Sequence, residues 1–196
     1  MALDPNVTGL PSSIRDAWND QDVATTVEWL LSGPAEDRWP DTPTCNGIAV
    51  TCVSILLSVD PRAALELLTT LIPRAATPAG RVRLLEQRLD AAARVDALDD
   101  LQATYGALAD ELADLDDPQV SVAVLNNAAT HLKSARAFGL AEQVLRDLLA
   151  TNDLQPSDRI AALINLGTVV GEVALSGQDQ RKRDVGPALA VLGQAA

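Results

Sequence analysis

The chain has 196 residues, of which 47% are hydrophobic, 21% are charged and 3% are aromatic. Abundant alanine and leucine, together with the lack of alternating strand patterns, predict a globular all-α protein. The formal net charge of −12 argues against binding to nucleic acid or to an anionic membrane surface, because both need a basic protein face.

The N-terminal 44 residues are the least regular part of the sequence. Residues 13–16 form a capping box that would open a short helix, and Val23 to Leu31 is apolar at helical spacing. A proline-rich connector occupies residues 33–43. We expect an irregular helical cap over residues 1–44. Its tryptophans either close the open end of a helical array or form a ligand-binding aromatic patch; they are Trp18, Trp29 and Trp39.

A cytoplasmic location is expected from the N-terminus and the cysteines. The opening residues MALDP lack the basic region and apolar run of a signal peptide. Cys45 and Cys52 would lie roughly 10 Å apart on one helix face, too far for a disulfide, which favours free thiols in a reducing compartment. The apolar stretch from Ile48 to Val59 is too short to span a bilayer. We expect no metal or other cofactor, because the two cysteines are accompanied by only one histidine.

Prolines recur at a nearly constant spacing along the rest of the chain. The offsets between Pro78, Pro118 and Pro156 are 40 and 38, and Pro40 precedes Pro78 by 38. Pro78, Pro118 and Pro156 each begin a stretch of helical periodicity, and the first turn of a helix tolerates a residue without a backbone N–H. This period is typical of arrays of helix pairs. The predicted pairs are 47–59 with 61–72, 79–95 with 97–116, 119–136 with 138–151, and 157–175 with 186–195.

The helix after Val95 combines an apolar face with an acidic one. Its apolar side is expected to pack against the preceding helix and comprises Leu98, Leu101, Tyr105, Leu108 and Leu112. Seven carboxylates fall on the opposite side: Asp96, Asp99, Asp100, Asp110, Glu111, Asp114 and Asp117. They form either a solvated outer face or a docking surface for a basic partner. The triplet Arg181-Lys182-Arg183 is likewise either a solvated loop or a partner contact.

Enzymatic activity is not expected. His131 is the single histidine, and no serine or cysteine nucleophile can be paired with it from the sequence. The glycine-rich phosphate loops and the paired histidines of metal sites are also missing.

Two blocks of the sequence match at an offset of 38. Leu125 pairs with Leu163, Asn127 with Asn165, and Ala129 with Gly167. The order of large, small and aromatic residues in this region resembles a tetratricopeptide repeat, although the period is longer than is usual in that family. The residues that resemble its two helices are Leu125, Ala128, Ala129 and Leu132, then Phe138, Ala141, Leu145 and Leu148.

The resemblance implies a right-handed α-solenoid of about four antiparallel helix pairs over residues 45–196, packed with the N-terminal cap as a single domain. Its concave groove would bind a peptide or a partner protein. The residues expected to face the groove are Asn126, Asn127, Thr130, Lys133, Asn165 and Thr168. Asn127 and Asn165 would hold the main chain of a peptide, because an amide both donates and accepts hydrogen bonds, or would instead bond to neighbouring helices.

The expected function is therefore that of an interaction module, an adaptor or regulatory subunit that binds another protein or a peptide. Other functions are a self-associating scaffold, which includes a homodimer, and an acidic decoy or inhibitor of a basic partner. A further one is a small-ligand regulator or an enzyme with a pocket near the tryptophans.

Overall fold

The computed structural model describes residues 12–20, 22–32, 43–75, 77–115, 117–151 and 154–176. These residues form nine α-helices and one 3-10 helix, and no strand occurs among them, which confirms the all-α prediction. No helix in these ranges is both long and apolar enough to cross a membrane. The chain divides into two compact units, residues 1–95 and 96–196, and each is described by itself.

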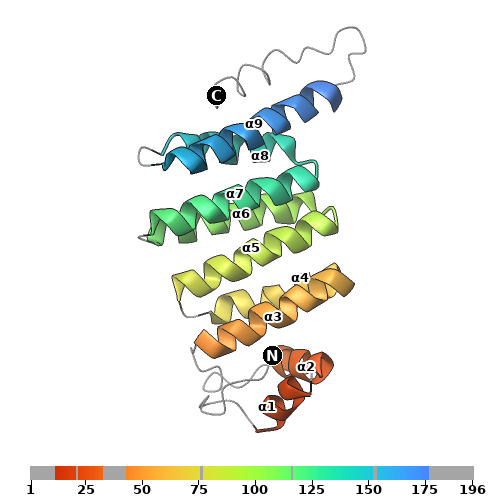
Figure 1. The fold of residues 1–196 in the computed structure, drawn as a ribbon. Helices are drawn as coiled ribbons and strands as arrows, with labels where there is room; N and C mark the ends of the chain where they lie inside the picture. Colours follow the sequence, from red (N-terminus) through yellow and green to blue (C-terminus); the bar gives the residue numbers. More distant parts are fainter. Residues whose placement is uncertain are drawn as a thin grey trace. The chain divides into compact units, whose positions relative to one another are not determined.

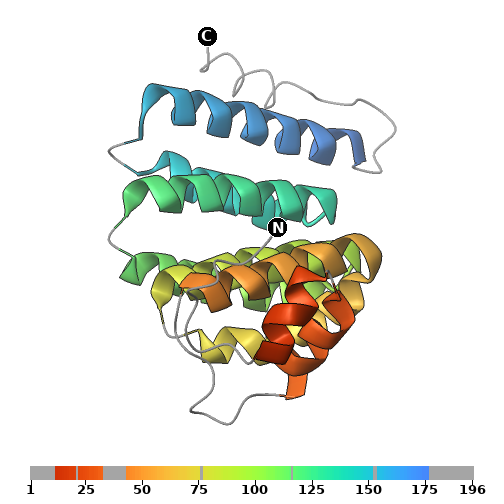
Figure 2. The ribbon, with the colours of Figure 1, turned by 60° about the horizontal axis from the view of Figure 1, so that its bottom comes forward.

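The first unit contains six helical elements (Figure 1). Helices α3 and α5 contact each other and both contact α4, while α2 contacts α3 and α4. Figure 2 shows α1 and α2 as a short pair beside α3 and α4. The elements are α1 (Ser12–Asn19), α2 (Val23–Ser32), α3 (Pro43–Val59), α4 (Pro61–Leu71), η1 (Ile72–Arg74) and α5 (Pro78–Arg94).

Helix starts in this unit follow from local chemistry. Asp60 accepts hydrogen bonds from the backbone N–H groups of Arg62 and Ala63, and Pro61 is the first helical residue, as predicted. Two predicted starts are wrong. Helix α3 begins at Pro43 rather than at residue 47, and Ser13 lies inside α1 rather than before its first residue.

The core of the first unit is aliphatic and is shared by all five α-helices. Leu30 of α2, Ile48 and Val53 of α3, and Leu67 of α4 are almost fully buried in it. Trp18 and Trp29 are partly buried against the same core. These two tryptophans therefore pack α1 and α2 onto the unit, and Trp39 lies outside the described residues.

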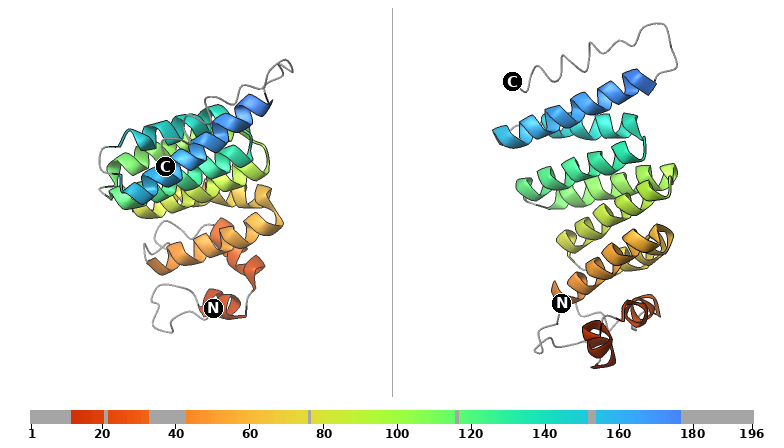
Figure 3. Two further views of the ribbon diagram at one scale, coloured as in Figure 1. Left: turned by 45° about the horizontal axis from the view of Figure 1, so that its top comes forward. Right: turned by 45° about the vertical axis from the view of Figure 1, so that its right-hand side comes forward.

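The second unit contains α6 (Leu98–Asp114), α7 (Pro118–Ser134), α8 (Phe138–Leu149) and α9 (Pro156–Ser176). Helices α7 and α9 run in the same direction, and α8 runs antiparallel to them (Figures 1 and 3). Each of these three helices contacts the other two, and α6 contacts α7. The triplet α7–α8–α9 thus repeats the arrangement of α3–α4–α5 within its own unit.

The turn between α7 and α8 is only three residues long. Arg136 adopts a left-handed backbone conformation with φ 58°, and its N–H donates to the carbonyl of Lys133. The N–H of Ala137 donates to the carbonyl of Leu132 over 2.9 Å, which closes the last turn of α7 in a Schellman motif. Asp96, which occupies the equivalent position one proline period earlier, has φ 55°.

The helices of the structure follow the predicted proline period. Pro78, Pro118 and Pro156 are the first residues of α5, α7 and α9. Pro40 and the expected final helix 186–195 lie outside the described residues. The domain boundary expected after residue 44 stays a prediction, and that position falls in the first turn of α3.

Candidate functional site

The predicted groove residues lie on one two-helix surface of the second unit, which we name the α7–α9 face. Its residues are exposed or half-buried, and the two helices contribute equivalent positions of the sequence repeat. Ile164, with 47% of its surface exposed, is the only large aliphatic side chain in it. The α7–α9 face consists of Ala123, Asn126, Asn127, Thr130, Lys133 and Ser134 from α7, and Ala161, Ile164, Asn165, Thr168 and Glu172 from α9.

Two amides join the helices at the centre of this face. Nδ2 of Asn165 donates to Oδ1 of Asn126 over 3.5 Å. Asn165 therefore bonds to a neighbouring helix, as one of the two sequence-based interpretations expected. The pair makes no further side-chain hydrogen bond within the described residues, so Nδ2 of Asn126 and Oδ1 of Asn165 remain as a donor and an acceptor next to each other. Asn127 is exposed on the same face.

The hydroxyl groups of the face already use their protons. Thr130 donates to the carbonyl of Asn126, Ser134 to that of Thr130, and Thr168 to that of Ile164, at 2.9–3.0 Å. These oxygens can therefore only accept hydrogen bonds from a partner. Lys133 is half-buried on the same face.

A third amide, Gln87 of α5, was not predicted from the sequence. Its Nε2 donates to the carbonyl of Val50 over 3.0 Å and to Oγ of Ser54 over 2.8 Å, both on α3. Gln87, Asn127 and Asn165 follow one another at the same offsets as the prolines that open their helices. The proline period was therefore a signal that could have identified Gln87, since all three amides occupy the tenth position of a proline-initiated helix.

The acidic face of α6 is confirmed in part. Asp99, Asp110 and Asp114 are exposed, whereas Asp100 and Glu111 are half-buried. On the opposite side, four of the five predicted apolar residues are buried or half-buried, but Leu98 is 59% exposed, so its predicted packing is wrong. Leu98 is the first residue of α6, where a side chain can extend past the end of a neighbouring helix. Burial and, secondarily, the charge of Asp147 raise the pKa of Tyr105.

Among the described residues, the groups capable of nucleophilic or metal chemistry lie apart from one another. Cys52 is a buried free thiol, and desolvation raises its pKa from 9.0 to about 12, which keeps it protonated. His131 is half-buried on α7. No cluster of three metal-binding side chains occurs in the part of the chain that the structure describes. The side chain of Cys45 and the triplet 181–183 fall outside the described residues.

No family model matches this sequence, and searches of the curated proteins and of the solved structures found no significant match. The resemblance to tetratricopeptide repeats is therefore one of residue pattern alone.

Proposed function

We propose that this protein is an interaction module that binds an extended peptide segment of another protein on the α7–α9 face. The observation that supports this best is the hydrogen-bonded pair of Asn126 and Asn165, which leaves one amide donor and one amide acceptor side by side on that face.

The hydrogen-bonding groups of the face suit a peptide main chain. The free Nδ2 of Asn126 could donate to a peptide carbonyl, and the free Oδ1 of Asn165 could accept from a peptide N–H. Because both amides are half-buried and already joined to each other, little side-chain freedom is lost on binding. Exposed Ile164 supplies apolar surface beside them.

We also propose that the helices form a tetratricopeptide-like α-solenoid. The two helix triplets, each with its first and third helix side by side, are consistent with a tetratricopeptide-like right-handed α-solenoid. In such an array the first helices of successive pairs would line the binding groove. A buried free thiol at Cys52 is compatible with a reducing cytoplasm.

The test begins with a phage-displayed library of random linear peptides, selected on the full chain. The best peptide is synthesised, and its affinity is measured by fluorescence anisotropy for the wild type and for the double variant Asn126→Ala/Asn165→Ala. Loss of two hydrogen bonds of about 1 kcal/mol each should weaken binding roughly thirtyfold. N-methylation of the contacted peptide bond should weaken binding to the wild type and have less effect on the double variant.

Gln143→Ala is the matched control, because Gln143 is an exposed amide on α8, outside the face. It should leave the affinity unchanged, and thermal melting should show that all variants are folded. Selection of no peptide, or equal affinity for wild type and double variant, contradicts the proposal. Concentration-dependent dimerisation that the double variant abolishes would favour the self-associating scaffold instead.

A further inference from the structure

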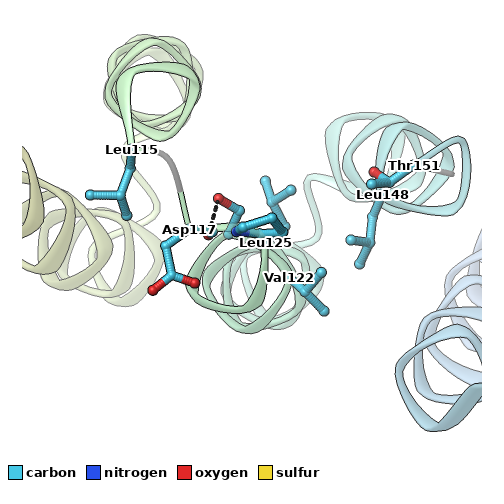
Figure 4. Close-up of a pocket in the computed structure, with 8 residues that line it drawn as sticks. Leu115, Asp117, Val122, Leu125, Leu148 and Thr151 are labelled. Atoms are coloured by element: carbon cyan, nitrogen blue, oxygen red, sulfur yellow. Dashed lines mark hydrogen bonds between the residues drawn. The ribbon is translucent and has the colours of Figure 1, made fainter. Parts of the chain in front are cut away.

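One side of α7 is covered by α8, which packs against it in the opposite direction. Figure 4 shows Val122 of α7 and Leu148 of α8 directed toward each other, and both line a pocket of about 250 Å³ together with Leu125. Farther along α7, Leu132 is fully buried. The side of α7 that carries α8 therefore runs from Val122 to Leu132.

The equivalent side of α9 is less well covered. At the repeat offset of 38, this side runs from Ile160 to Val170. Ile160 is 44% exposed, although its counterpart on α7 is half-buried, and Val170 is half-buried, although its counterpart is fully buried. Leu163 and Gly167, between them, are buried. The described helices that pack on α9 are α7 and α8, so neither end of this side has a cover equivalent to α8 within the described ranges.

The apolar pattern of α8 recurs in the sequence after α9, among residues that lie outside the described ranges. In α8 the last three residues of this pattern are at most 1% exposed, so the pattern marks the side that faces the core. Residues 185–196 contain no charged side chain, and a helix formed by them would be stabilised by burial of its apolar side. The two sets of residues, with identical spacing, are Phe138, Ala141, Leu145 and Leu148, and Val185, Ala188, Leu192 and Ala195.

We infer that residues 185–195 of the same chain bind as a helix to this side of α9, at the position that α8 has on α7. The repeat identifies the occupant, because α9 matches α7 and residues 185–195 match α8. Residues 177–184 can span about 26 Å when extended, enough to let the helix run back along α9. The contact between Val122 and Leu148 then places Ala195 beside Ile160. This docking covers apolar surface at the last helix and is independent of peptide binding.

The test is a disulfide between the two predicted neighbours, Ile160→Cys and Ala195→Cys, in a full chain that also carries Cys45→Ser. Cys52 is buried and can stay in place. The matched control pair is Ala161→Cys with Ala195→Cys, because Ala161 is exposed on the α7–α9 face, one residue farther along α9. The first pair should close about tenfold faster than the control pair, because a bound helix holds its cysteine at one site, whereas an unbound tail samples both. Mass spectrometry and non-reducing gels measure the two rates.

Two substitutions within the segment show whether its apolar side makes the contact. Leu192→Glu places a charge on that side and should slow the first pair to the rate of the control pair. Ala190→Glu lies on the opposite side of the helix and should leave the rate unchanged. Equal rates for the two cysteine pairs overturn the inference. Disulfides that join two chains, at a rate that rises with protein concentration, also overturn it and assign this side of α9 to a second copy.

Discussion

Cys52 provides a quantitative test of the first unit's core. Its side chain is fully buried among aliphatic residues of α3 and α4, and desolvation raises its pKa from 9.0 to about 12. At pH 8 an unshifted thiol would be about one-tenth thiolate, and the buried thiol about one ten-thousandth. Because only the thiolate is alkylated, the folded protein should react at least a thousandfold more slowly with iodoacetamide than the unfolded chain.

The assay uses a Cys45→Ser variant, so that Cys52 is the single thiol, and mass spectrometry follows alkylation with and without denaturant. Native and denatured rates within tenfold of each other would refute the packing of α3 described above. Between pH 9.5 and 10.5, alkylation of the denatured chain should level off, while that of the folded chain should keep rising about tenfold per pH unit.

The same shift makes stability depend on pH. The folded-state pKa is above the unfolded one, so this contribution to stability is complete below pH 9 and is lost as the pH rises toward 12. The loss is about 1.4 kcal/mol per pH unit in that window. Urea unfolding at pH 8 and pH 10.5 should therefore show a larger decrease for the wild type than for Cys52→Ala.

Two further predictions concern the second unit. Tyr105 is the single tyrosine, and its absorbance titration should have a midpoint above 10; Asp147→Asn should lower that midpoint without restoring the ordinary value, since burial is the larger cause. No change in the midpoint would contradict the proximity of α6 and α8. Arg136→Gly should raise the melting temperature by a few degrees, because glycine removes a left-handed strain of about 1–2 kcal/mol and adds a smaller entropic cost. A lower melting temperature would show that the turn is not strained.

Features that depend on neighbouring residues in the sequence were predicted well. Pro61, Pro78, Pro118 and Pro156 open helices because an N-terminal turn needs no N–H from its first residue. The start of α3 was predicted four residues late. Gly47 has poor helix propensity, but burial of the following residues, Ile48, Ala49 and Cys52, stabilises the helix through it.

Features that depend on how helices meet could not be predicted from one helix at a time. Periodicity placed Asn126 and Asn165 on equivalent helices, but the contact between their amides also requires the axial offset of α9 against α7. The pocket lined by Val122 and Leu125 of α7 and by Leu148 of α8 similarly depends on where α8 ends relative to the start of α7. Leu98 satisfies the apolar pattern of α6 and is nevertheless exposed. It is the first residue of the helix, and periodicity does not predict whether a neighbouring helix extends far enough to cover that residue.

The three-residue turn at Arg136 also has a kinetic consequence. It joins α7 to α8 so closely that the residues packed between them, such as Leu132 and Leu145, are near each other along the chain. Contacts of short sequence separation cost little loop entropy, and helical proteins dominated by them fold in microseconds to milliseconds. The α7–α8 hairpin is thus suited to form early in folding, before α9 packs onto it and brings Asn165 to Asn126.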